Sequence, residues 1–133
     1  MHDWHFAHLA SYFATPLASL MTTSAQTAFP ATETLPWLTV GQGMQRQILA
    51  YGPELMLVKV AFETGGVGAR HHHVHSQITY VESGVFRCTV GEQEQVLQAG
   101  DTFYAAPDVW HGVECLEAGV LLDSFSPMRE DFV

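Results

Sequence analysis

The most informative segment of this sequence spans residues 65–77 and reads Gly-Gly-Val-Gly-Ala-Arg-His-His-His-Val-His-Ser-Gln. In an extended strand, residues two apart point to the same face, so His71 and His73 share a face, Gln77 can return to it and His72 points away. Two imidazoles this close repel each other if both are protonated, and a divalent cation removes the repulsion by binding both neutral rings. The segment therefore predicts a strand that carries metal ligands.

A third histidine is available from a distant part of the chain. His111 follows a turn at Pro107 and, with His71, His73 and the side-chain oxygen of Gln77, it makes a set of three imidazoles and one oxygen. Such a set leaves one or two positions open for water or substrate, as a catalytic metal site requires. The competing interpretation is a compositional accident or a solvated histidine-rich loop, and the spacing of the surrounding residues argues against it.

Two spacing motifs surround these candidates. The first runs from Gly65 to Gly84, with five, one, three and six residues between successive Gly, His, His, Gln and Gly positions; the second runs from Gly100 to His111, after an interval of 15 residues. Together they resemble the two motifs of the cupin superfamily, over about residues 40–125. The resemblance implies a small jelly-roll β-barrel whose metal ligands are three His and one Glu or Gln, here His71, His73, Gln77 and His111.

The pattern of apolar residues agrees with this fold class. From Trp37 onward, short apolar runs alternate with turn signals, which predicts an all-β chain of antiparallel strands. We expect one barrel domain over residues 37–133, preceded by an irregular N-terminal arm over residues 1–36 with a short helix and a linker. His2, His5 and His8 lie in that arm, and we assign them no function. The expected strands are 44–50, 55–62, 77–82, 85–90, 95–97, 102–105, 112–116 and 119–125, with Ser83-Gly84 among the turns.

The chain departs from the usual cupin pattern in a few positions. Gln77 stands where Glu is more frequent, so the site carries one negative charge fewer and a divalent ion keeps its full charge, which suits an anionic substrate. The second motif differs around Ala106, Pro107 and Asp108, and Cys115 replaces its final Asn, which affects the turn more than the ligands. Nickel, zinc, manganese and iron all suit this ligand set.

The C-terminal segment holds two further candidates. Asp123 alternates with Leu121 and Phe125 along the last expected strand, so it points either into the barrel or outward. Desolvation among apolar neighbours would raise the pKa of this carboxyl group and fit it for proton transfer, while a local turn or an arginine partner is an open alternative. Arg129 would grip a substrate carboxylate with two parallel hydrogen bonds, or pair with one of the two acidic residues that follow it.

Several segments together resemble the pectin degradation cupins. They are Trp37, Arg46, residues 48–50, residues 57–60, Gly84, residues 100–103 and the ending Phe-Ser-Pro-Met-Arg-Glu-Asp-Phe at 125–132. That family converts cyclic 4,5-unsaturated monouronates from pectin or alginate into linear keto uronates. The resemblance implies Asp123 as the proton-transfer residue, with Phe125 and Arg129 lining the substrate site.

Three other functions remain as alternatives at this stage. A metal-dependent dioxygenase would use the histidines with iron and consume O2. A non-catalytic sugar or acid sensor usually carries an added DNA-binding domain, for which this chain has no room. A cofactor-free epimerase of the sugar-nucleotide type would need a His-Asp dyad without the full ligand set.

Composition excludes several classes of protein. Five Lys and Arg face fourteen Asp and Glu, a net charge of −9, which argues against nucleic-acid binding and against an electrostatic membrane anchor. No apolar run reaches the length of a membrane span, and the first cation is Arg46, which argues against a signal peptide. We therefore expect a cytoplasmic protein with Cys88 and Cys115 reduced, a single disulfide being the alternative. We also expect a homodimer, because barrels of this type leave sheet edges that pairing would cover.

Overall fold

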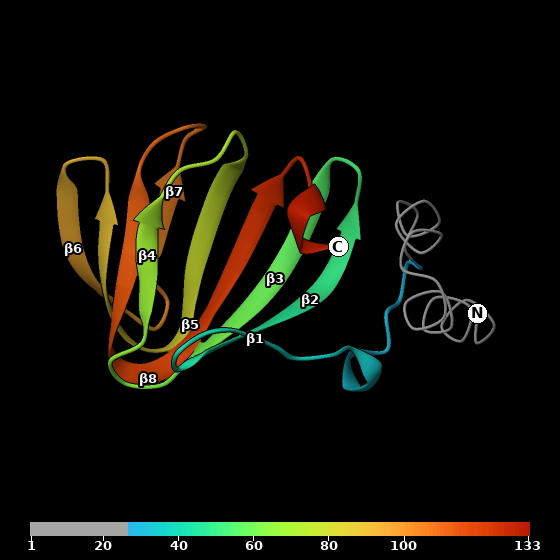
Figure 1. The fold of residues 1–133 in the computed structure, drawn as a ribbon, viewed down its shortest axis with the longest axis horizontal. Coiled ribbons are helices and arrows are strands. Elements are labelled where there is room, and N and C mark those ends of the chain that lie inside the picture. The colour runs from blue at the N-terminus through green and yellow to red at the C-terminus, as the bar shows by residue number, and fades with distance from the viewer. Residues whose placement is uncertain (1–26) are drawn as a thin grey trace.

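The computed structural model describes residues 27–133, and the N-terminal histidines His2, His5 and His8 lie outside the described residues. This part of the chain folds into eight strands that all pair in antiparallel fashion, as Figure 1 shows, so the all-β prediction is confirmed. The strands are β1 (Leu38–Gly41), β2 (Met44–Gly52), β3 (Leu55–Phe62), β4 (Val67–His71), β5 (Ser76–Val90), β6 (Gln93–Gln98), β7 (Thr102–Ala105) and β8 (His111–Ser126), and the short 3-10 helices are η1 (Thr32–Thr34) and η2 (Glu130–Phe132).

The sheet closes around the two long strands β5 and β8. The hydrogen-bonded order is β1-β2-β3-β8-β5-β6, with β4 on β8 and β7 on β5. The first half of β5 pairs with β7 and with the end of β8, whereas its second half pairs with β6 and with the start of β8. Each long strand therefore contributes to both halves of the barrel, and Figure 1 shows β8 curving along the lower edge.

One predicted turn is wrong. Ser83-Gly84 does not separate two strands, since β5 continues through it, and β8 likewise continues where we expected a break between residues 116 and 119. The two strands bend together here, with register shifts on both sides of Ser83. Gly84 has a φ of +82°, and a Cβ at Gly119 would overlap the backbone carbonyl of Ser83, so the two glycines allow the close approach. A Ser-Gly pair that permits a bulge looks the same in sequence as one that forms a turn.

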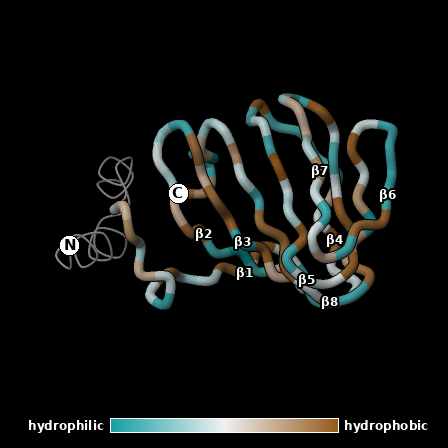
Figure 2. Tube along the Cα trace, turned by 180° about the vertical axis from the view of Figure 1, so that it is seen from behind, coloured by the Kyte–Doolittle hydropathy of each residue, from teal (hydrophilic) through white to brown (hydrophobic). Residues whose placement is uncertain are grey.

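The barrel interior is apolar because inward and outward positions alternate along the strands. In β3 the buried residues Met56, Val58, Val60 and Phe62 alternate with more exposed ones, and Figure 2 shows this alternation of hydrophobic and hydrophilic positions along the strands. Phe62 packs edge-to-face on Phe86 with ring centroids 5.2 Å apart. The rest of the core consists of Val81, Cys88, Leu97, Cys115, Leu121, Phe125 and Met128. Both cysteines are buried and free.

The segments before and after the barrel are tied to it. Gln47 of β2 is buried, and its side-chain amide donates hydrogen bonds to the carbonyl oxygens of Thr32 (3.3 Å) and Leu35 (3.1 Å). At the other end, the N–H of Met128 donates to the carbonyl of Pro53, and η2 follows close to the C-terminus (Figure 1), where Phe132 contacts Arg46 of β2. Within residues 27–133 no helix is long and apolar enough to cross a membrane. The domain boundary between residues 36 and 37 stays a prediction.

Candidate metal and catalytic site

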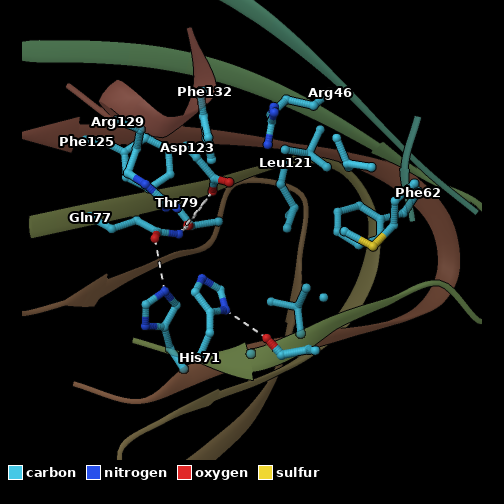
Figure 3. A pocket seen from close by; sticks show the side chains of 18 of the residues that line it. Arg46, Phe62, His71, Gln77, Thr79, Leu121, Asp123, Phe125, Arg129 and Phe132 are labelled. Atoms are coloured by element: carbon cyan, nitrogen blue, oxygen red, sulfur yellow. Dashed lines mark hydrogen bonds between the residues drawn. The ribbon is translucent and has the colours of Figure 1, made fainter. Parts of the chain in front are cut away.

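A cavity of about 260 Å³ opens inside the barrel, close to the lower end of the size range of small-molecule pockets. Strands β2, β3, β5 and β8 line it, together with residues of β4 and the C-terminal segment. Apolar residues form much of the wall, and the polar groups gather in two places, which Figure 3 shows as a lower histidine group and an upper group around Asp123. The lining residues with polar side chains are Arg46, His71, Gln77, Thr79, His111, Asp123 and Arg129.

Three histidines converge at one end of this cavity. His71 is the last residue of β4 and pairs in register with His111, the first residue of β8. The side chain of His73 turns back toward them, although β4 has ended at residue 71, so the predicted single strand through both histidines is wrong. The ligand atoms of the three residues all lie within 4.8 Å of one another. His71, His73 and His111 are therefore positioned to bind a metal ion.

Backbone contacts orient the three imidazoles. Nδ1 lies 2.7 Å from the carbonyl oxygen of Ala69 in His71, 3.0 Å from that of His75 in His73, and 2.8 Å from that of Val109 in His111. Each ring in its neutral form therefore carries its hydrogen on Nδ1 and presents the lone pair of Nε2 as the ligand atom. This arrangement, with a backbone acceptor behind each ring, is typical of metal-binding histidines.

Burial keeps two of these rings neutral. Desolvation is the largest of the causes that lower the pKa of His111 to about 4, and positive charge on His71, His73 and Arg129 contributes to the same shift. Desolvation is also the largest cause that lowers the pKa of His73. Neutral imidazole is the form that binds a metal ion.

The side chain of Gln77 joins the histidines to the upper polar group. Its Oε1 lies 2.9 Å from Nε2 of His73 and 3.0 Å from Nε2 of His111, while its NH2 group donates to Oγ1 of Thr79 at 2.9 Å. Oε1 is an acceptor, so its contact with two lone pairs is repulsive unless a ring is protonated or a cation lies among these atoms. Burial opposes protonation, and the donor set of imidazole nitrogens and one amide oxygen therefore fits a divalent metal ion.

His72 and His75 complete the histidine-rich tract but lie outside the cluster of three. His72 points away, as predicted, with Nδ1 3.6 Å from a carboxylate oxygen of Asp108 and its ring 4.5 Å from that of Trp110. His75 packs its ring against that of His73 at 5.3 Å. Of the four histidines in the tract, His71 and His73 therefore belong to the cluster and His72 and His75 do not.

Asp123 faces the cavity rather than the outer surface. It pairs in register with Thr79 of β5, whose hydroxyl donates a hydrogen bond of 2.6 Å to Oδ1, and the NH2 group of Gln77 lies 3.4 Å from the same oxygen, as Figure 3 shows. The surrounding protein raises the pKa of Asp123 to about 6 by desolvation, against the two hydrogen bonds and the charge of Arg129, which favour the ionised form. A carboxyl group with such a pKa can both give and take a proton near neutral pH.

The C-terminal segment closes the cavity beside Asp123. Phe125 packs its ring edge-to-face on His73 at 5.6 Å and on Phe132 at 5.7 Å. The guanidinium of Arg129 lines the cavity, but its Nε and one NH2 group bind both oxygens of Asp131 at 3.0 and 2.8 Å. The two alternatives for Arg129, a place in the cavity and a pair with an acidic neighbour, are therefore both present. The same pair lowers the pKa of Asp131.

Sequence reasoning assigned no role to three residues of this cavity. Thr79 holds both Gln77 and Asp123, and its position two residues after Gln77 on one strand face was a usable signal. In the sequence, Arg46 and Phe132 belong only to the segments that resemble the pectin degradation cupins. Both depend on contacts between β2 and η2, which are far apart in the chain.

Comparison with known proteins agrees with this geometry. The model of the family described as Cupin domain (Cupin_2) matches residues 58–125. The pectin degradation protein KdgF of Dickeya dadantii (strain 3937) is 41% identical over 100 residues, which are 74% of this chain and 91% of that protein.

Two solved structures are similar over nearly their whole length. An RmlC-like cupin from Shewanella frigidimarina NCIMB 400 has 44% identity and a TM-score of 0.78, covering 81% of this chain and 97% of that one. KdgF from Halomonas sp. has 38% identity and a TM-score of 0.76, covering 82% of this chain and all of that one (100%). The chain therefore belongs to the cupin family and, within it, to the pectin degradation cupins that include KdgF, as its two motifs and its C-terminal segment predicted.

Proposed function

We propose that this protein is a metal-dependent enzyme that opens the ring of cyclic 4,5-unsaturated monouronates, derived from pectin or alginate, and converts them to linear keto uronates. The observation that carries the proposal is the chain of contacts from the histidine cluster through the side chain of Gln77, and from there by hydrogen bonds through Thr79, to Asp123. This chain of contacts supports a metal site and a proton-transfer group within one small cavity. The similarity to KdgF supports pectin degradation as the context.

We infer that Gln77 is the fourth protein ligand beside His71, His73 and His111. Its amide cannot rotate freely, because the NH2 group donates to Thr79 and so directs Oε1 toward the histidines. The bound ion, which we expect to be nickel, zinc, manganese or iron, would supply positive charge beside the substrate oxygens that become negative during the reaction. Since Gln77 and the three imidazoles are all uncharged, the proposed ligands do not reduce the positive charge of the ion.

Asp123 is the proposed acid and base. As a carboxylate it takes the proton of the C1 hydroxyl, the bond between C1 and the ring oxygen breaks, and C1 becomes an aldehyde. The electron pair of that bond stays on the former ring oxygen, which is attached to C5 of the C4=C5 double bond. Delivery of a proton to C4 then gives the C5 ketone, so the proton that Asp123 removed is balanced and the reaction is an isomerisation.

Phe125 and Arg129 are the proposed substrate-binding residues. Phe125 is buried between His73 and Phe132 and gives the sugar ring an apolar wall next to the metal ligands. Arg129 uses Nε and one NH2 group for Asp131, which leaves its other NH2 group for the substrate carboxylate. Asp131 thus holds the guanidinium in place within the cavity wall.

We also propose that the protein is a homodimer and that it is located in the cytoplasm. Strands β1 and β6 are the two ends of the hydrogen-bonded strand order, and we expect a second copy of the chain to cover an exposed edge, giving a homodimer. Light scattering coupled to size exclusion would measure its mass. Cytoplasmic placement is expected from the two free, buried cysteines.

The decisive experiment incubates the metal-replete protein with the unsaturated monouronate and follows the loss of its enol-ether absorbance, with and without a chelator. Faster loss than in buffer, abolished by the chelator and restored by added metal, supports the proposal. A rate equal to that in buffer overturns it. Oxygen consumption by the same sample would instead identify the dioxygenase alternative, because the isomerisation uses no O2.

A further inference from the structure

Arg46 is a second cation on the wall of the cavity that holds Asp123. It lies on β2, where it pairs in register with Val60 of β3, and its side chain reaches the cavity from the side of the barrel opposite the histidine cluster, as Figure 3 shows. The chain has only five Lys and Arg residues, and two of them, Arg46 and Arg129, line this one cavity. In a protein of net charge −9, this placement concentrates positive charge where a small anion would bind.

The two guanidinium groups share one aromatic ring. The central carbon of Arg46 lies 3.7 Å from the centroid of Phe132, and that of Arg129 lies 4.2 Å from it. Figure 3 shows Phe132 between the two arginines. Stacking on an aromatic face fixes the plane of a guanidinium while leaving its N–H groups directed outward in that plane. Phe132 therefore orients both cations at the same end of the cavity.

An acidic neighbour engages most of the donors of Arg129. Asp131 binds Arg129 with both carboxylate oxygens, and its own side chain is 60% exposed. Asp123 directs Oδ1 to Thr79 and Gln77. Arg129 is thus largely engaged with Asp131, and a substrate carboxylate that needs two parallel hydrogen bonds requires a further donor.

We propose that Arg46 is that donor: it binds the carboxylate of the uronate substrate together with Arg129, and so makes the enzyme selective for sugar acids over their esters and neutral sugars. The inference rests on the proposed function and names a specificity-determining residue for it. Arg46, Phe132 and Arg129 form one unit in which the ring holds the two cations at a fixed separation. Because the C-terminal segment supplies two of the three members, it is part of the substrate site.

A binding experiment tests the role of Arg46 independently of catalysis. Calorimetry with galacturonate and with its methyl ester, on the metal-replete protein, measures the preference for the free acid without requiring any reaction. In Arg46→Met the preference for acid over ester should fall about 10- to 100-fold, the effect of losing a charge-assisted hydrogen bond. Arg46→Lys keeps the positive charge but loses the planar guanidinium that donates two parallel hydrogen bonds. It should therefore retain part of the acid-over-ester preference. Arg87→Met is the matched control, because Arg87 is exposed and paired with Glu114, and it should change nothing.

An unchanged acid-over-ester preference in Arg46→Met would overturn the inference, and if the affinities for acid and ester had fallen equally, Arg46 would be shown only to support Phe132. If Arg46→Met does not fold, the same comparison in Arg46→Lys decides. Turnover adds a second readout: with the unsaturated uronate, KM should rise about tenfold or more and kcat should stay within about threefold. If the wild-type protein prefers the acid but does not open the unsaturated ring, the proposed function alone is contradicted. If the wild-type protein shows no preference for the acid, the role of Arg46 is contradicted.

Discussion

The hydroxyl group of Thr79 donates a hydrogen bond of 2.6 Å to Oδ1 of Asp123. The two residues are directly opposite each other on β5 and β8, so the sheet itself fixes the contact. The same hydroxyl accepts a hydrogen bond from the NH2 group of Gln77. Thr79 therefore holds the carboxyl group that we propose for proton transfer, and its hydrogen bond lowers the pKa of Asp123 against the larger effect of desolvation.

Replacing Thr79 by Val tests this role, because it removes the hydroxyl and keeps the shape. The hydrogen bond stabilises the ionised form of Asp123, so its loss should raise the pKa of Asp123 further above about 6, by about one unit. The pH profile of kcat/KM, or carbon NMR of the labelled carboxyl group, measures the change. The acidic limb should move to higher pH, and a profile identical to that of the wild type would remove Thr79 from the mechanism.

Asp123→Asn tests the proton-transfer group itself. The amide preserves the volume but can neither take nor give the proton, so ring opening should slow by at least about 100-fold while metal content stays unchanged. The matched control is Asp108→Asn, since Asp108 lies on the surface beside His72 at a positive φ that Asn also adopts. Full activity in Asp123→Asn would assign the chemistry to another group.

Removal of one imidazole tests the metal site. His111→Ala removes the buried imidazole from the cluster of three, and the metal affinity should fall by more than the 10- to 100-fold typical of losing a group that only orients a ligand. His72→Ala is the control from the same tract, because its side chain pairs with Asp108 and points away. Elemental analysis after dialysis gives the metal content. Equal metal content in the two variants would contradict the site.

The thiols should be inert in the folded protein. Burial, aided by the charge of Asp123, raises the pKa of Cys88 to about 11, so only about one molecule in a thousand carries the thiolate at pH 8. Burial also raises the pKa of Cys115. A chromogenic disulfide reagent should therefore find almost no thiol in native protein and two after unfolding. Rapid reaction of the native protein would show that the barrel opens far more readily than its packing indicates.

Gly119→Ala tests the crossing of the two long strands. A methyl group there would overlap the carbonyl of Ser83, so the strands must separate and the free energy of unfolding should fall by about 3 kcal/mol. Gly52→Ala is the control, because a Cβ at Gly52 meets no atom within 4 Å. Urea denaturation followed by tryptophan fluorescence compares the variants. Equal stability of the two would show that the bend relaxes at little cost.

Local patterns in the sequence were sufficient for most of the strands but not for their continuity. The alternation in residues 55–62 predicts β3 with its observed bounds, because each side chain there is assigned by its own polarity. The continuation of β5 through Ser83-Gly84 depends instead on its close pairing with β8. No local sequence pattern carries information about that pairing. The same limit applies to His73, which reaches the cluster from a bend beyond β4 rather than from the strand.

The candidate site, too, could be predicted from the sequence only in part. His71 and His111 could be predicted as site residues, because the spacing of the two motifs matches that of the ligand positions in cupins. The partners of Asp123 could not, because they follow from the register between β5 and β8, and that register is set by bulges on both sides of Ser83. Arg46 and Phe132 are 86 positions apart in the chain and meet only when the C-terminal segment folds over β2.

Strand β8 begins at His111, passes through Asp123 and Phe125, and pairs on its way with β4, β5 and β3. All three residues are odd-numbered positions on its inner face. One residue inserted or deleted between His111 and Asp123 would turn one of these two side chains to the outside of the barrel. A change of one residue in the length of β8 would therefore need a compensating bulge, like those on both sides of Ser83, to keep both side chains inside the barrel.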